Sequence, residues 1–537
     1  MPKRVIAKLK SDIESTGEIT LALRELARLC GDVSVRTADS HEVETWTEIN
    51  TAESKSLFLV TEVDSLPNLN TRLDRLAYAD WYVCGDLRRE VPQQAQLESL
   101  ASEAAGRIKA SRRDREYLSH GIHKYKAKFF PRFARALINI CSPELDATVL
   151  DPFCGSGTTG LEAGLIGLRP ICSDIDPLSC LISQAKVRFP LVPLSEIDLV
   201  ERAVNLRGVS AQAELFESLP RAPYKIPNFL RTKLAPEVAS EIESDMSTLV
   251  TRVASMPSQS TRSLAGLMIS HAISTKISLR WVGTGDNRFA VELAARDIFS
   301  IISSQVKRLR SNHPEAIGYR LPLTAIEGLS GARFKNTSAD TIELPDDSVD
   351  SVVTSPPYLP ASSGRETYLR SRAPGLVALE LLSEDQIHEL DATEVVGSVL
   401  RKSGGTENGY LLPDAAIQLV EWMRPQRARG PKSDATLVYF RDLGRIAKEM
   451  HRVLRPGGLM AMVVCTSHSF YELVSREVVR RFPLAQILAE YFTEPQYGIG
   501  FESVEPIEIE LPKMDYNARP GSRHKYSETA LIFKKQS

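Results

Sequence analysis

The sequence has no long apolar run, and its first residues, M-P-K-R, do not lead into an apolar signal core. A membrane-spanning helix needs about 20 consecutive apolar residues, and a secretory signal needs an apolar core of its own. Its seven cysteines are scattered and form no C-x-x-C pair, so neither a zinc site nor a disulfide framework is supported. We therefore expect a cytoplasmic protein with no membrane contact and no bound metal.

An excess of basic residues is also missing, because 66 lysines and arginines face 68 aspartates and glutamates and leave a net charge of −2. Proteins that coat nucleic acid without sequence preference are usually basic overall. Any nucleic-acid contact must therefore come from local patches. Two basic clusters, 107–113 and 424–432, could provide them or could be solvated faces.

With 537 residues, the chain is too long for one compact core and should divide into two or three units. Short strand and helix patterns in residues 1–112 predict an N-terminal α/β module, with nucleic-acid or partner binding as its possible role. Residues 113–186 and 331–537 predict two parts of one α/β core. Residues 187–330 predict a mostly helical insertion that could recognise the target, with helices over 235–254, 262–274 and 291–309, and an extra segment follows at about 360–435.

A glycine-rich turn follows a short apolar strand in the first part of this core. The strand at 147–150 runs into D-P-F-C-G-S-G-T-T-G at 151–160, and an apolar helix follows. This arrangement presents backbone amides to a ligand at the end of a parallel strand. Gly155 and Gly157 lack a Cβ where the ligand must pass closely, and Asp151 is placed to receive an ammonium group.

A second strand at 169–173 ends in Asp174, about twenty residues after the turn. An acid at that position can accept hydrogen bonds from the ribose hydroxyls of an adenosine. The letters G-x-G-x-x-G at 155–160 also fit a nicotinamide or flavin site. The D-P-F that precedes them is not typical of that class.

The turn resembles the D-P-F-x-G-x-G-T-T motif of the amino-methyltransferases of DNA. The resemblance implies S-adenosylmethionine as cofactor and a Rossmann-like class I methyltransferase core. Upstream, H-G-I-H-K-Y-K-A-K-F-F-P at 120–131 resembles the segment that in this family closes over the methionine end of the cofactor. His120 and His123 are then either direct ligands or ordinary loop residues.

A second motif follows a strand in the later part of the core. The strand 351–354 ends in S-P-P-Y at 355–358, which resembles the catalytic motif of the same family. The resemblance assigns Asp340 to the adenine amino group of the cofactor. The implied cofactor-binding residues are Asp151, Phe153, Gly155, Gly157, Thr158, Thr159, Asp174 and Asp340, and the implied catalytic residues are Ser355, Pro356, Pro357 and Tyr358.

The chemistry of methyl transfer to a base explains these residue types. An exocyclic amine is a poor nucleophile because its lone pair is conjugated with the ring, so acceptors must orient its N–H bonds. The Ser355 hydroxyl and the Pro356 carbonyl are candidate acceptors, and two consecutive prolines hold the loop extended. Tyr358 can stack on the base, which must leave the duplex to reach such a pocket.

The resemblance implies methylation of an exocyclic amine in DNA, and S-P-P-Y is associated more often with N4 of cytosine than with N6 of adenine. The segment after Tyr358 contains Arg365, Tyr368, Arg370 and Arg372 close to the active loop. Its arginines could hold phosphates or be surface charge. The sequence indicates neither the recognition site nor the oligomeric state.

Two other interpretations remain open. The layout of an N-terminal α/β module ahead of the cofactor motif is similar to that of tRNA guanine-N2 methyltransferases, although those enzymes generally have an acidic residue where this chain has Ser355. The chain could also be an inactive nucleic-acid-binding relative.

Overall fold

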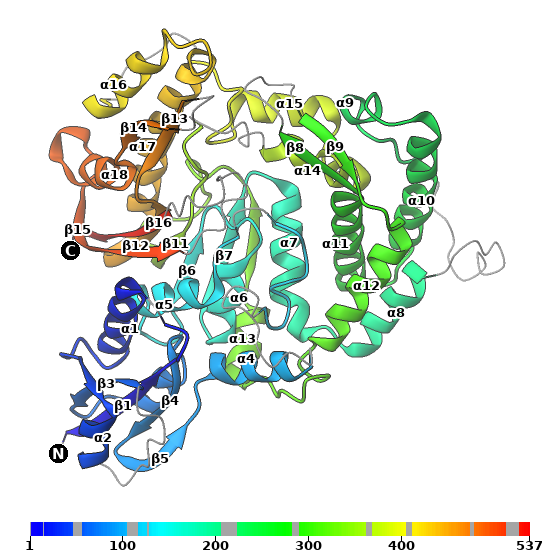
Figure 1. The fold of residues 1–537 in the computed structure, drawn as a ribbon. Coiled ribbons are helices and arrows are strands. Elements are labelled where there is room, and N and C mark those ends of the chain that lie inside the picture. Colours follow the sequence, from blue (N-terminus) through cyan, green and yellow to red (C-terminus); the bar gives the residue numbers. More distant parts are fainter. Residues whose placement is uncertain are drawn as a thin grey trace.

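The computed structural model describes residues 2–13, 15–46, 56–104, 116–125, 128–205, 223–281, 289–360, 368–403, 411–472, 477–511 and 526–536. In this part of the chain, no helix combines the length and the apolar character needed to cross a membrane. Figure 1 shows an N-terminal sheet, a central sheet and a helical lobe beside the central sheet.

The central sheet has seven strands, and the first five in spatial order are mutually parallel. β16 runs antiparallel to both of its neighbours, β12 and β15. When the strands are numbered along the chain, their spatial order is 3-2-1-4-5-7-6. The seventh strand, β16, lies between the fifth and the sixth and runs antiparallel to both. The strands in sheet order are β10 (Arg333–Asn336), β7 (Arg169–Asp174), β6 (Thr148–Asp151), β11 (Val349–Thr354), β12 (Leu454–Cys465), β16 (Tyr526–Lys535) and β15 (Phe501–Leu511).

Alternate residues of the central strands are buried on opposite faces of the sheet, as the period of a strand requires. Val149 and Val353 belong to the cluster that includes α5 (Pro131–Cys141). Leu150 and Val352 belong to the cluster on the other face. The helices that contribute to that second cluster are α16 (Asp414–Met423), α17 (Ser433–Val453) and α18 (Leu484–Thr493).

The N-terminal module is a five-stranded antiparallel sheet in the order β2-β3-β1-β4-β5. Its helix α1 begins at a capping box formed by Ser15 and Glu18 and packs against α5 of the central unit. The module and the central sheet therefore share one apolar cluster. Its elements are β1 (Lys3–Leu9), α1 (Thr16–Leu29), β2 (Arg36–Asp39), α2 (Ser40–Trp46), β3 (Leu57–Val63), α3 (Leu69–Leu73), β4 (Ala79–Cys84), β5 (Asp86–Glu90) and α4 (Gln93–Ala104).

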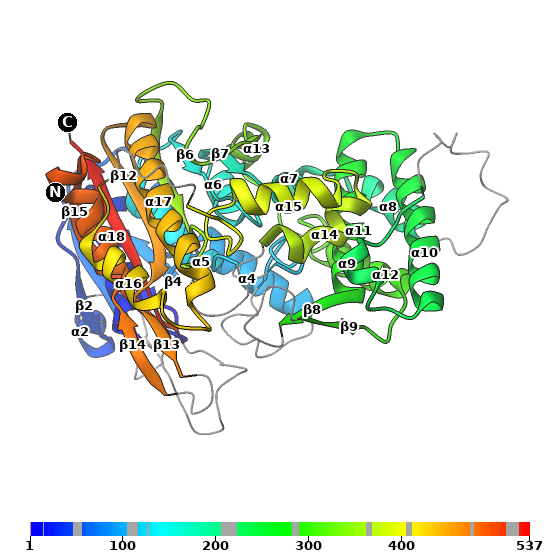
Figure 2. The same cartoon turned by 90° about the horizontal axis from the view of Figure 1, so that it is seen from above.

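A helical lobe lies between β7 and β10 in the chain. Figures 1 and 2 show its helices on one side of the central sheet. Its stretch at 291–309 is not helical throughout. Residues Phe289–Leu293 form a strand, β9, that pairs with β8 (Ile277–Trp281), and the helix begins only at Ile298. The helices of the lobe are α8 (Leu194–Asn205), α9 (Asn228–Arg231), α10 (Pro236–Ala254), α11 (Gln259–Lys276) and α12 (Ile298–Ser311).

The segment after the S-P-P-Y loop is divided between two parts of the molecule. Its first helix, α14 (Tyr368–Ala378), packs on α11 and α15 (Glu384–Thr393) and joins the core of the lobe. α16 instead packs on α17 beside the central sheet. The chain segment that follows the catalytic motif therefore borders both the lobe and the sheet.

Candidate cofactor and base site

A cavity of about 1010 Å³, part of it open to solvent, lies at the carboxyl ends of β6, β7 and β11. Between β6 and β11 the connections turn to opposite sides of the sheet, which is where α/β folds bind ligands. Both sequence motifs meet on its wall. The predicted site residues that line it are Asp151, Phe153, Gly155, Thr158, Thr159, Asp174, Ser355, Pro356, Pro357 and Tyr358.

The glycine turn connects β6 to α6 (Thr158–Leu165), and both of its first two glycines have a positive φ. A Cβ on Gly155 would lie 2.9 Å from the hydroxyl of Tyr125, which covers the turn at that point. A Cβ on Gly157 would lie 2.7 Å from the Cα of Ser183 in α7 (Pro177–Arg188). Gly157 does not line the cavity, so its missing side chain serves helix packing and not ligand clearance.

Asp151 ends β6 and is bound to the end of the neighbouring strand. The Thr354 hydroxyl donates to its carboxylate at 2.7 Å, and the Phe153 amide donates at 3.1 Å. Burial raises the pKa of Asp151 to about 6, against these two hydrogen bonds, which lower it. The group is still largely ionised at neutral pH and is placed to receive a cation.

Asp174 ends β7 and accepts a hydrogen bond from the amide of Gly155 at 2.9 Å. Burial and the adjacent Asp176 raise the pKa of Asp174 to about 7, while nearby Arg372 opposes that rise. Asp176 begins α7 and accepts from the Leu178 amide at 2.9 Å. Two carboxyl groups therefore share the part of the cavity that lies at the end of β7.

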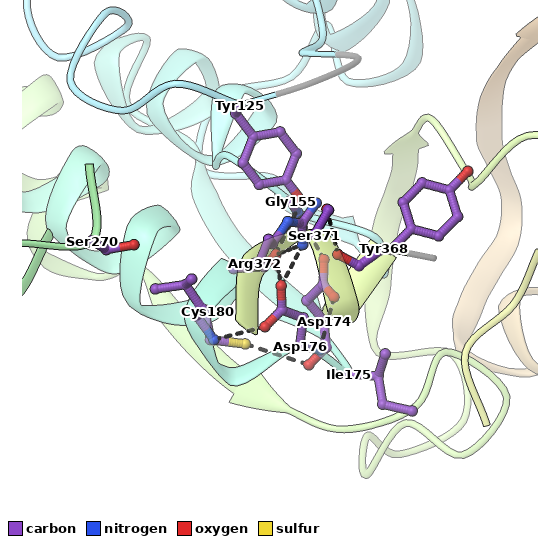
Figure 3. A network of polar contacts seen from close by, with 12 residues as sticks. Tyr125, Gly155, Asp174, Ile175, Asp176, Cys180, Ser270, Tyr368, Ser371 and Arg372 are labelled. Atoms are coloured by element: carbon purple, nitrogen blue, oxygen red, sulfur yellow. Dashed lines mark hydrogen bonds and ion pairs between the residues drawn. The ribbon is translucent and has the colours of Figure 1, made fainter. Parts of the chain in front are cut away.

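Arg372 extends from α14 to these acids, as Figure 3 shows. It forms an ion pair with Asp176, donates to the Ser179 hydroxyl at 2.8 Å, and lies 4.3 Å from the ring centroid of Tyr125. Arg372 is thus neither a phosphate ligand nor surface charge in this structure. Arg370 packs over the ring of Phe229 at 4.6 Å, and Arg365 lies outside the described residues.

The S-P-P-Y tetrad is held by contacts with several other segments of the chain. Ser355 donates its hydroxyl to the carbonyl of Val463 in β12 at 3.3 Å, which leaves lone pairs on its oxygen. The Tyr358 hydroxyl donates to Glu528 of β16 at 3.2 Å. Three other contacts complete the support: Tyr439 donates to the Pro357 carbonyl at 3.1 Å, Tyr358 donates its amide to the Tyr368 hydroxyl at 3.2 Å, and Gly397 leaves room for the Tyr358 carbonyl.

The two histidines of the upstream segment do not line the cavity. His120 is buried against Glu162, with its Nε2 at 2.6 Å from the carboxylate, and burial lowers its pKa to about 4. His123 is bonded to the Ser270 hydroxyl at 3.0 Å, and burial lowers its pKa to about 3. From the same segment, Tyr125, Lys128 and Phe129 line the wall instead.

Asp340 is turned away from this cavity. It forms an ion pair with Arg445 at 2.6 Å, accepts from Ser338 at 2.7 Å, and lines a neighbouring cavity. Its neighbours Ser338 and Ala339 line the main cavity. The contact of Asp340 with the adenine amino group remains a prediction.

Motif reasoning missed some residues of the wall because they lie in segments without a sequence signature. Only Asp176 had a local signal, since D-P at 176–177 is a typical helix start. The missed residues that line the cavity are Asp176, Ser338, Ala339, Leu369, Glu394, Val395 and Val396, whereas Tyr368, which also lines it, was singled out from the sequence.

The chemistry of the wall fits S-adenosylmethionine. The carboxyl groups of buried Asp151 and half-buried Asp174 suit an ammonium group and ribose hydroxyls, and Gly155 carries no side chain where the turn faces the cavity. Phe129, Phe153 and Ile175 supply apolar surface. When bound there, this cofactor supplies an activated methyl group on a sulfonium.

The strand order with its reversed seventh strand, the glycine turn and the acid after the second strand define a Rossmann-like class I methyltransferase core, whose cofactor is S-adenosylmethionine. Residues 121–205 match the UPF0020 family, described as an RMKL-like methyltransferase domain. These residues contain the cofactor turn, β7 and α7.

Relatives of two kinds resemble the chain. A tRNA (guanine(10)-N2)-dimethyltransferase of Methanocaldococcus jannaschii is 33% identical over 106 residues, which is 19% of this chain and 28% of the relative. Type II methyltransferase M.MjaII of the same organism is 37% identical over 78 residues, 14% of each chain. Type II methyltransferase M.MvaI of Kocuria varians is 24% identical over 419 residues, 70% of this chain and 81% of the relative. The first two matches span less than a third of the relatives.

Proposed function

We propose that the protein transfers a methyl group from S-adenosylmethionine to an exocyclic amino group of a base in DNA. The observation that supports this most strongly is that the glycine turn and the S-P-P-Y tetrad line one cavity. A methyl donor on the turn and an amine on the tetrad would meet there. The names of M.MjaII and M.MvaI, both Type II methyltransferases, agree with the proposal.

The tetrad is suited to orienting an amine. Since the Ser355 hydroxyl donates to Val463, its oxygen can accept one N–H of the target, and the Pro356 carbonyl can accept another. Fixed acceptors of this kind act without reorganisation during the reaction. They place the nitrogen lone pair in line with the methyl group, and the amine proton leaves after transfer.

We favour N4 of cytosine over N6 of adenine, because the tetrad begins with Ser355. The base would reach the cavity by flipping out of the duplex, since a stacked base cannot enter a recessed site. Tyr358 would stack on it. The N-terminal module and the helical lobe are candidates for target recognition.

Labelled cofactor offered with duplex DNA and, separately, with tRNA tests this proposal. Label entering DNA is expected, and base-resolution mapping of DNA methylation in cells expressing the protein would then identify the base, the atom and the sequence. Label entering only tRNA would reject the DNA assignment.

The second candidate is a tRNA guanine-N2 methyltransferase, favoured by the 33% identity to the archaeal tRNA enzyme over the cofactor region. Ser355 in place of an acid argues against it. An inactive relative is the third candidate. Calorimetry with S-adenosylmethionine tests that case, because no detectable binding of the cofactor would favour an inactive relative.

A further inference from the structure

Helix α14 contacts both halves of the proposed site. Tyr368 and Arg372 are four residues apart, which places them on one side of a helix. The hydroxyl of Tyr368 accepts a hydrogen bond from the backbone amide of Tyr358 at 3.2 Å, so Tyr368 supports the tetrad. Arg372 forms its ion pair with Asp176, beside the ribose acid Asp174 (Figure 3). Tyr368, which supports the tetrad, and Arg372, which lies at the cofactor end of the cavity, are therefore one helical turn apart.

Arg372 is held firmly at this position. Its side chain is 18% exposed and that of Asp176 is 3% exposed, and a buried charge of this kind is costly unless it is paired. Tyr125, over which Arg372 stacks, also bonds the Ser179 hydroxyl at 3.0 Å. The arginine thereby joins α14, the start of α7 and the segment that covers the glycine turn.

We propose that α14 couples the cofactor site to the catalytic tetrad, with Arg372 as a positioning residue for Asp174 and Tyr368 as a positioning residue for Tyr358. Arg372 compensates one of two adjacent carboxylates, which keeps the other as an acceptor for ribose hydroxyls. Filling the cofactor site then fixes Arg372, the helix and the Tyr358 amide together. The inference relies on the proposed function for the identity of the cofactor and the tetrad.

The electrostatic surroundings of Asp174 agree with this role. Burial and Asp176 raise its pKa to about 7, and Arg372 is the cation that opposes them. Removing that cation raises the pKa further, so the carboxylate form is lost at a higher pH. The titratable groups around the acid pair are Asp176 from α7, Arg372 from α14, Tyr125 from the covering segment, Cys154 from the turn, Cys180 from α7 and Asp391 from α15.

The test compares Arg372→Met, Arg372→Lys and wild type in two measurements on the full chain. Calorimetry gives the Kd for S-adenosylmethionine as a function of pH. We expect Arg372→Met to weaken binding about tenfold at pH 7 and to move the loss of affinity to higher pH. The lysine variant keeps the charge and should recover most of the affinity.

Hydrogen exchange of the Tyr358 amide is the second measurement. Pro356 and Pro357 carry no amide, so few protons report on this loop. Saturating cofactor should slow exchange at Tyr358 in wild type and leave it nearly unchanged in Arg372→Met. Tyr368→Phe should lose the protection while binding cofactor normally.

Arg370→Met is the matched control, because it removes the same charge from the same helix at a residue that packs on Phe229. It should behave as wild type in both measurements. Wild-type affinity at every pH in Arg372→Met, or cofactor protection of Tyr358 in that variant, would overturn the coupling. Neither measurement needs a methyl acceptor, so absent transfer to DNA would reject only the proposed function. A wild-type chain that binds no cofactor would overturn both.

Discussion

In the proposed function Ser355 contacts the target amine and Tyr358 stacks on its ring. The hydrogen bonds of their hydroxyls go to Val463 and Glu528, and not to the glycine turn. We expect Ser355→Ala to lower the rate of methyl transfer about 100-fold, because one fixed acceptor is lost. Tyr358→Ala should also lower it strongly through lost stacking.

Affinity for S-adenosylmethionine, measured by calorimetry, should remain unchanged in both variants. A loss of cofactor binding would mean that the tetrad has been assigned to the wrong part of the cavity.

Asp174 should have the opposite profile. Asp174→Ala is expected to weaken cofactor binding at least about tenfold, because charged acceptors form the stronger hydrogen bonds. Because the pKa of Asp174 is about 7, the affinity of the wild type for the cofactor should also depend on pH. The carboxylate is the acceptor, so wild-type affinity should fall as the pH drops through about 7, and the alanine variant should lack that step.

Calorimetry between about pH 6 and pH 8.5 would measure this step. A wild-type affinity that is flat across this range would contradict the assignment of Asp174 to the ribose.

Among the elements, α4, α5 and α6 meet in a fully buried polar cluster. Glu162 of α6 forms an ion pair with Arg135 of α5 at 2.6 Å. Its carboxylate also accepts a hydrogen bond from the Tyr117 hydroxyl and contacts Nε2 of His120, each at 2.6 Å. Arg135 in turn donates to Gln93 of α4 at 2.9 Å. The cluster connects the N-terminal module to the helix that follows the cofactor turn.

Glu162→Gln should therefore lower the free energy of unfolding by about 3 to 5 kcal/mol, because it leaves a buried guanidinium unpaired. Burial raises the pKa of Glu162, but Arg135, His120 and Tyr117 together outweigh burial and lower the pKa to about 2 from 4.5. Its stabilisation is therefore complete above pH 4.5 and is lost as the pH falls toward 2.

Urea unfolding at neutral pH measures the change. Glu327→Gln, on the exposed side of α13 (Leu323–Ser330), is the control and should stay within about 0.5 kcal/mol of wild type. Equal stabilities for the two variants would contradict a structural role for the cluster.

At the scale of the whole molecule, a two-stranded ribbon with exposed arginine extends beyond the carboxyl end of β12. β12 continues past its carboxyl end into β13 (His468–Tyr471), which pairs with β14 (Val478–Phe482) and projects from the sheet in Figure 2. Arg480 lies over the ring of Trp422 at 5.0 Å. Within the described residues, Arg427 and Arg481 are exposed and have no ion pair.

If Arg427 and Arg481 contact phosphates, the double variant Arg427→Gln with Arg481→Gln should weaken nucleic-acid binding. The slope of log affinity against log salt should fall by the contribution of about two phosphate contacts. Filter binding across a salt series measures both quantities. Arg169→Gln with Arg333→Gln is the matched control, because these exposed residues begin β7 and β10 at the opposite edge. Equal effects of the two pairs would exclude a local contact.

Much of the core was predictable because its signals are local. The strand–turn–helix unit at 147–165 and the strand before Ser355 have clear apolar patterns, and the structure has both. Residues 291–293 of the strand Phe289–Leu293 were predicted as the start of a helix, since a short apolar run suits either state until its partner β8 is known.

The sequence by itself determined the chemistry: which residues form a glycine turn, which acid ends the next strand, and that two prolines stiffen a loop. These follow from short-range geometry and residue type. Only the tertiary structure decided that Arg372 pairs with Asp176, that Asp340 pairs with Arg445, and that His120 is buried in a polar cluster. The direction of a polar side chain depends on partners that lie 42 to 196 residues away here, because the free energy of burying the side chain is decided by the groups it contacts.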